Sequence, residues 1–123
     1  MPVFLSQLSI VSALILFAGC DRGTAPVKVD LARETLTTVM DCWKEGKSQE
    51  DLAPRIIVQD MDWTSGAELL DYEKLDDDRP INSNLYARVK LKLRFPNETE
   101  STKIATYVVS TSPGLTVFRD MMK

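Results

Sequence analysis

Two acidic clusters carry the side chains of this sequence that could do chemistry. Asp60 and Asp62 are separated by one residue, and paired carboxylates can act as general acid and general base when their surroundings separate their pKa values. Residues 76–78 are three consecutive Asp, but a calcium loop needs spaced carboxylates closed by a distant bidentate Glu. Adjacent acids in turns usually form the turn itself. We therefore expect no catalytic residue, no metal site and no cofactor.

A cysteine that follows small residues is the second feature with chemical meaning. Residues 16–20 read Leu-Phe-Ala-Gly-Cys and close an apolar stretch that begins near Ile10. The apolar core of roughly ten residues is too short to span a bilayer, which needs about twenty, and suits a signal peptide. The pattern resembles a bacterial lipobox, in which a peptidase cuts between Gly19 and Cys20 and the Cys20 thiol carries diacylglycerol.

The lipobox resemblance divides the chain into three parts. It implies a signal peptide in residues 1–19, a lipidated Cys20 with a tether in residues 20–28, and one domain in residues 29–123. Each buried methylene of an acyl chain such as palmitate contributes about 0.8 kcal/mol, so two or three chains hold a protein at a membrane. We therefore expect a lipoprotein of the bacterial cell envelope, lipid-anchored to a membrane and facing the periplasm or the exterior.

Composition narrows the range of partners. With 15 basic and 18 acidic residues the net charge is −3. This argues against nucleic acid as a binding partner, because nucleic-acid binders are strongly basic. The chain has no His, so the commonest general base and metal ligand is missing. With Cys20 committed to lipid, Cys42 has no second Cys to pair with, and we interpret it as a semi-buried thiol at the edge of a helix.

One long amphipathic helix is predicted after the tether. From Asp30 onward, apolar residues recur at three- and four-residue spacing, which places them on one helix face. They are Ala32, Leu36, Val39, Met40 and Trp43. Asp30 is the expected N-cap, and Gly46 is the expected stop. A short second helix should begin after Ser48 and end before Pro54.

After the helices the pattern changes to a period of two, which is typical of strands with one buried face. In residues 85–95, apolar side chains alternate with Tyr86 and four basic residues, so one side of this strand should face the core. Further strands are predicted in residues 67–75, 102–111 and 115–119, with turn-rich segments between them. Short connections favour antiparallel pairing of consecutive strands.

These elements predict an α+β fold. We expect an N-terminal signal helix, then one long amphipathic helix and a short helix packed on a four-stranded antiparallel β-meander. The order of a helix followed by a curved sheet resembles cystatin-like and nuclear-transport-factor-2-like rolls, and this resemblance rests on element order alone. It implies a sheet that can curl round a cavity.

Four short segments are similar to uncharacterised small lipoproteins of planctomycete bacteria. They are residues 43–48 (Trp-Lys-Glu-Gly-Lys-Ser), 60–63 (Asp-Met-Asp-Trp), 106–113 (Thr-Tyr-Val-Val-Ser-Thr-Ser-Pro) and 116–119 (Thr-Val-Phe-Arg). The likeness covers most of the mature chain. It implies no activity, since that family has none assigned.

Four basic residues share the predicted solvent-facing side of the strand over residues 85–95. They are Arg88, Lys90, Lys92 and Arg94. Glu73, Asp71 or Glu100 on neighbouring strands could neutralise them as cross-strand pairs. The alternative is an exposed surface for anionic lipid or an acidic envelope protein, which suits a domain tethered near phospholipid headgroups.

Two classes of function stay open at this point. The favoured one is a membrane-anchored, non-catalytic interaction module of the cell envelope. The alternative is a roll-type small-molecule-binding protein or enzyme with a pocket lined by Tyr72, Tyr107 or Asp71. A filled core beneath Trp43 and Trp63 would favour the first class, and a cone-shaped cavity would favour the second.

Overall fold

The structure, a computed structural model, describes residues 25–121 and is an α+β fold, as predicted. Helix α2 (Val29–Lys44) is followed by the 3-10 turn η2 (Gln49–Asp51), strand β1 (Ile56–Gln59) and the short helix α3 (Met61–Thr64). The remaining strands are β2 (Glu68–Lys74), β3 (Arg79–Ile81), β4 (Asn84–Arg94), β5 (Glu100–Ser110) and β6 (Leu115–Arg119). The predicted signal helix in residues 1–19 and the predicted lipidation site Cys20 lie outside the described residues.

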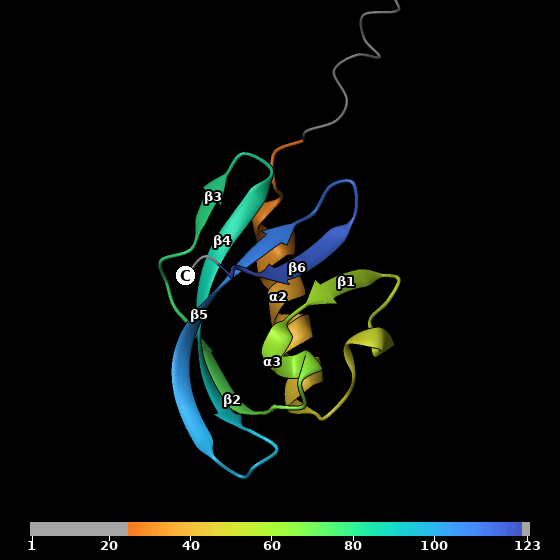
Figure 1. Cartoon of the computed structure of the whole chain (residues 1–123). Helices are drawn as coiled ribbons and strands as arrows, with labels where there is room; N and C mark the ends of the chain where they lie inside the picture. Colours follow the sequence, from red (N-terminus) through yellow and green to blue (C-terminus); the bar gives the residue numbers. More distant parts are fainter. Residues whose placement is uncertain (1–24, 122–123) are drawn as a thin grey trace, which may run out of the picture.

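The strands form a six-stranded mixed sheet, so the predicted four-stranded antiparallel meander is wrong. The order is β1-β6-β5-β4-β2, and β3 also pairs with β4. β1 runs parallel to β6, with Ile56 beside Leu115, while the other neighbours are antiparallel. Figure 1 shows the sheet curving around α2.

The two strands missing from the prediction are both short. β1 reads Ile-Ile-Val-Gln, a run too brief for periodicity to separate it from other structures, and its partner β6 lies near the other end of the chain. β3 contains Pro80, and Pro is depleted from strands because it cannot donate a ladder hydrogen bond. β3 tolerates Pro80 because it pairs with β4 alone.

The alternation predicted for residues 85–95 is confirmed in β4. The core side chains of this strand are Leu85, Ala87, Val89, Leu91 and Leu93, each at most 5 % exposed. Between them, Lys90 and Lys92 face solvent. β5 pairs with β4 along its whole length, so the same division into two faces continues across the sheet.

Helix α2 buries its predicted apolar stripe. Its buried side chains include Ala32, Leu36, Val39, Met40 and Trp43, each at most 2 % exposed. The prediction of Asp30 as N-cap is wrong: the helix begins at Val29, and the preceding Lys28 makes no side-chain capping hydrogen bond. Asp30 lies instead in the first turn, where its negative charge suits the helix dipole. Gly46, with a φ of +85°, follows the end of the helix as predicted.

The predicted short second helix is a single 3-10 turn with a capping box at Ser48. The Ser48 hydroxyl accepts a hydrogen bond from the Glu50 N–H at 3.0 Å, and the Asp51 carboxylate accepts one from the Ser48 N–H at 3.0 Å. Neither this turn nor any other helix in residues 25–121 is long and apolar enough to cross a membrane.

The sheet has one covered and one uncovered face. α2 packs against β2, β5 and β6 on the concave side, and both helices lie on this side in Figure 1. The convex side, called the outer face below, carries alternate side chains of β4 such as Lys90, together with their cross-strand neighbours such as Glu73 and Ile104. No helix in the described part of the chain covers the outer face.

Candidate functional site

Asp60, one of the two predicted acid-base candidates, caps helix α3. It follows β1 directly, and its Oδ1 accepts hydrogen bonds from the N–H groups of Asp62 and Trp63 at 2.9 and 3.4 Å. This is the usual role of Asp at a helix N-terminus. Unlike a solvated turn residue, however, its side chain is only 1 % exposed. A buried carboxylate needs a cationic partner.

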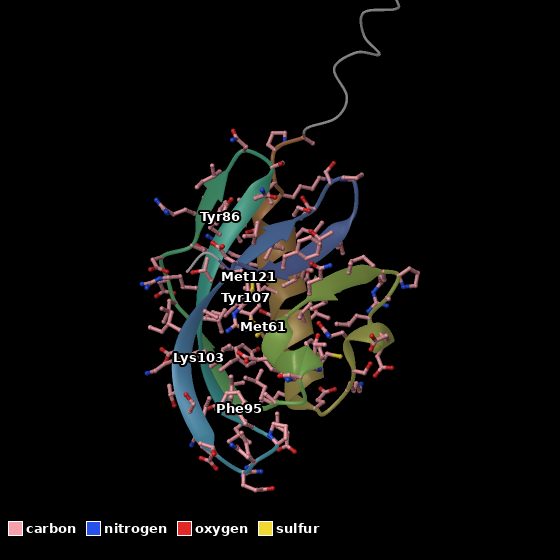
Figure 2. All side chains as sticks on the ribbon, in the orientation of Figure 1. Met61, Tyr86, Phe95, Lys103, Tyr107 and Met121 are labelled. Atoms are coloured by element: carbon pink, nitrogen blue, oxygen red, sulfur yellow. The ribbon has the colours of Figure 1, made fainter. Side chains whose placement is uncertain are left out.

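Arg119 at the end of β6 supplies that cation. Its Nη1 lies 2.8 Å from Asp60 Oδ1, and its Nη2 lies 2.9 Å from Asp62 Oδ2. Two residues of β5 complete the arrangement: Lys103 Nζ lies 3.0 Å from Asp62 Oδ2, and the Tyr107 hydroxyl donates a short hydrogen bond to Asp60 Oδ2. Figure 2 shows Lys103 and Tyr107 on the strand that faces α3. We call these five residues the inner charge cluster.

The inner charge cluster is electrostatically balanced, with two carboxylates and two cations. Burial alone disfavours a charged Asp62, but hydrogen bonds from Lys103 and Arg119 outweigh it and lower the pKa of Asp62. Burial, together with the negative charge of Asp60, raises the pKa of the Tyr107 hydroxyl, which therefore stays protonated. All the charged groups are engaged with each other. These contacts join the end of β1 and helix α3 to strands β5 and β6.

The sequence interpretation singled out the two carboxylates and missed Lys103 and Arg119. The sequence did contain one indication of Lys103. Side chains two residues apart on a strand lie on the same face, so Lys103 in β5 points inward with the buried Ala105 and Tyr107. An inward-pointing Lys on a strand implies a carboxylate partner inside. The identity of that partner depends on long-range packing, since Asp62 and Lys103 are 41 residues apart.

Trp43 and Trp63 form a stacked pair in the interior. Their rings stack with centroids 5.2 Å apart and planes 8° from parallel. Each indole N–H is satisfied by a backbone carbonyl, that of Ala67 for Trp43 at 2.9 Å and that of Lys47 for Trp63 at 3.1 Å. Both rings are buried and belong to the hydrophobic core, so they fix the segment after α2 against the start of β2.

The three residues expected to line a pocket have different surroundings. Tyr107 lies in the inner charge cluster with no exposed surface. The Tyr72 hydroxyl donates to Asp41 at 2.7 Å, and burial together with this contact raises the pKa of Tyr72 to about 12. Asp71 accepts a hydrogen bond from Lys44 at 3.2 Å, which lowers the pKa of Asp71. Asp71 and Tyr72 border the same surface hollow of about 320 Å³, and Tyr107 does not line it.

The basic stripe on the outer face is neutralised at its two ends. Arg88 Nη2 lies 2.5 Å from Asp77 Oδ2, and Arg94 lies 3.3 Å from Glu68 and 3.4 Å from Glu100. The cross-strand pair of Arg94 with Glu100 was predicted. The pair with Asp77 was not, because Asp77 belongs to the loop after β2.

The middle of the stripe is different. Lys90 lies directly opposite Glu73 and Lys92 directly opposite Asp71 in the register of β2 and β4. Neither lysine forms an ion pair within the described part of the chain: Asp71 bonds Lys44 instead, and Lys92 affects it only at longer range. Ile104, on the other side of Lys90, is 53 % exposed. Two free ammonium groups beside an exposed apolar side chain remain on this face.

The remaining candidates have structural surroundings. Of the residues 76–78, Asp77 pairs with Arg88 and Asp78 pairs with Arg33 at 2.8 Å. In residues 25–121 no three acidic, Cys or His side chains gather as metal ligands would. Cys42 is buried against the core, and burial raises the pKa of its thiol, which disfavours the reactive thiolate.

Comparison with known proteins adds no homologue. No family model, no curated protein and no solved structure matches this chain. The similarity of residues 43–48, 60–63, 106–113 and 116–119 to planctomycete lipoproteins, and the resemblance to cystatin-like and nuclear-transport-factor-2-like rolls, stay predictions. The function is therefore argued from the sequence signal and the surfaces above.

Proposed function

We propose that this protein is a lipid-anchored, non-catalytic interaction module of the bacterial cell envelope, and that its outer face binds an acidic protein partner. The anchor is the lipobox cysteine, Cys20. The observation that carries the binding proposal is the pair Lys90 and Lys92, which stay unpaired although acidic residues lie directly across the sheet. Charged side chains free to pair with a partner steer and orient association.

The chemistry around the two lysines fits a protein surface. They border a hollow of about 320 Å³ whose other lining residues are Asp71, Tyr72, Glu73 and Thr102. Ile104 lies beside Lys90, and Phe118 of β6 is a further exposed apolar side chain on this face. Protein interfaces combine apolar anchors at their centre with polar groups around them. An acidic partner would complement both the charge and the apolar contacts.

The position of the lysines relative to the chain start favours a protein over lipid headgroups. The described chain starts at one end of the domain, where the Val27 N–H donates to the Asn82 carbonyl at 3.1 Å. Lys90 and Lys92 lie six and eight residues along β4 from Asn84, which at about 3.3 Å per residue is about 20 and 26 Å. A tether attached at that end holds the lysines away from the membrane surface.

The non-catalytic part of the proposal rests on the state of the acidic side chains. Asp60 and Asp62, the best candidates for acid-base chemistry, are both engaged by Arg119. A general base must be free to accept a proton from a substrate. These carboxylates instead hold two strands and a helix together.

The anchor is tested by the intact mass of the protein purified from membranes of its own host, with palmitate labelling alongside. We expect a mass that begins at Cys20 and includes acyl chains. Cys20→Ser should remain an unlipidated, uncleaved precursor. Fatty-acid labelling of Cys20→Ser, or a full-length unlipidated mass for the parent protein, would refute the anchor.

The binding surface is tested by photo-crosslinking in intact cells. The probe is p-benzoylphenylalanine at position 104, on the outer face. We expect a discrete protein adduct that is lost when Lys90→Glu or Lys92→Glu is added. Lys47→Glu is the matched control: it makes the same change of charge on the exposed segment after α2, where Lys47 contacts Glu45. An adduct that survives both outer-face changes, or labels lipid only, would contradict the proposal.

A further inference from the structure

The hairpin between β3 and β4 has an exposed outer strand. All three residues of β3 are exposed, and Ile81 at its end is 43 % exposed. With Ala25, Pro26 and Tyr86, the hairpin borders a surface hollow of about 500 Å³. Ile81 and Tyr86 therefore place apolar surface at this end of the sheet.

This hairpin lies beside the point where the described chain starts. The Val27 N–H donates to the Asn82 carbonyl at 3.1 Å, and the Lys28 N–H donates to Thr111 Oγ1 at 3.0 Å. Figure 1 shows the first described residues next to the tip of the hairpin, at the same end of the domain as the turn between β5 and β6. The direction in which the chain enters the domain is therefore fixed relative to Ile81.

The length of the tether limits how far this end can lie from the anchor. Cys20 and Ala25 are separated by five residues, and a fully extended chain covers at most about 3.6 Å per residue, or about 18 Å in total. If the acyl chains on Cys20 are inserted in a bilayer, Ala25 lies within that reach of the headgroups. The hairpin borders the same hollow as Ala25, so this end of the sheet is then the end closest to the membrane.

The charges at this end suit an anionic surface. Arg79 on β3 forms no ion pair with any described residue and affects Asp77 only at longer range. Asp30 in the first turn of α2 lies 3.8 Å from Arg33, and in the loop before β3 Asp77 pairs with Arg88 and Asp78 with Arg33. A basic residue near a membrane surface of anionic lipid is attracted to that surface. Tyr86, labelled near this end in Figure 2, has the amphipathic ring that is enriched at membrane interfaces.

We infer that the β3–β4 hairpin seats the domain on the bilayer, with Ile81 in the interfacial layer, Tyr86 beside it and Arg79 facing anionic headgroups. This inference rests on the proposed lipid anchor and adds an orientation to it. In this orientation β4 runs away from the membrane. Lys90 and Lys92 then face sideways, where a neighbouring envelope protein can reach them.

Depth-sensitive fluorescence quenching tests the orientation. The lipidated full chain is reconstituted into vesicles of phosphatidylcholine and phosphatidylglycerol whose acyl chains are brominated near the headgroup, because bromine quenches Trp on contact. Ile81→Trp places a probe in the hairpin, and Ile104→Trp is the matched control on the outer face. Trp43 and Trp63 are buried and give a constant background.

We expect the added emission of Ile81→Trp to be lost in brominated vesicles and that of Ile104→Trp to be unchanged. Quenching of Ile104→Trp instead would mean that the outer face lies on the lipid, and quenching of neither would mean that the domain stands off the membrane. Both results would overturn the inference and leave the anchor intact. Failure of the parent protein to float with the vesicles would refute the anchor, and with it the seating of the hairpin.

Discussion

The two faces of the sheet differ in whether their charged side chains are paired. On the concave side, Asp60 is buried and Asp62 is partly buried, and each has Arg119 within 2.9 Å. On the outer face, Lys90 and Lys92 lie opposite acidic residues and still pair with none of them. A buried charge must be paired for the fold to exist, whereas an exposed charge can be left for a partner. The comparison therefore separates charges that maintain the structure from charges that are available for binding.

The largest effect is expected from Arg119→Leu. The substitution leaves two carboxylates without their shared guanidinium in a buried setting, and breaking a buried pair this way costs about 3–5 kcal/mol of unfolding free energy. Urea unfolding followed by the emission of the stacked Trp43 and Trp63 measures the change. The control is Arg94→Leu on the outer face, where an exposed pair is worth about 0–1 kcal/mol. Equal losses for the two variants would contradict the comparison.

Removal of the hydroxyl from Tyr107 should have the next largest effect. Tyr107→Phe keeps the ring in the core but removes the hydrogen bond to Asp60. A buried carboxylate oxygen then lacks one donor, which lowers the unfolding free energy by about 1–3 kcal/mol. Tyr72→Phe is the control, since the Tyr72 hydroxyl bonds the exposed Asp41 and water can replace it. The same unfolding assay decides. A greater loss for Tyr72→Phe would show that the inner charge cluster is not the tighter network.

The pH dependence of stability probes Asp62. The pKa of Asp62 is lowered in the folded state, so its contribution to stability is complete above the unfolded value of about 3.9 and is lost as the pH falls through the lower folded value. We expect the difference in unfolding free energy between the parent and Asp62→Asn to be constant near neutral pH and to shrink below about pH 4. Unfolding curves at a series of pH values measure it. A difference that grows as the pH falls would reverse the assigned sign.

The same contrast explains what could be predicted from the sequence. The strands over residues 67–75, 85–95, 102–111 and 115–119 have structural counterparts because each pattern is local: side chains alternate between core and solvent within a few residues. The outer-face stripe followed from the same alternation. The α+β class followed from the order of the elements.

Local sequence patterns could not predict the inner charge cluster. Asp60 and Arg119 are 59 residues apart, and they meet because β1 adds to the sheet in parallel beside β6. Nothing in the local sequence of either strand specifies that pairing. The capping role of Asp60 was likewise hidden, because α3 is a single turn that continues from a strand missing from the prediction.

The smallest effect is expected on the outer face itself. Lys90→Gln with Lys92→Gln removes two charges that have no partner, so the unfolding free energy should change by less than about 0.5 kcal/mol. Leu91→Ala is the control between them: its side chain points into the core, and such a truncation costs about 2–5 kcal/mol. Leu91 lies between the two lysines on a single strand, so the two variants compare the opposite faces of the same segment. If the lysine variant lost as much stability as the leucine variant, Lys90 and Lys92 would belong to the fold, and the outer face would have no charge to offer a partner.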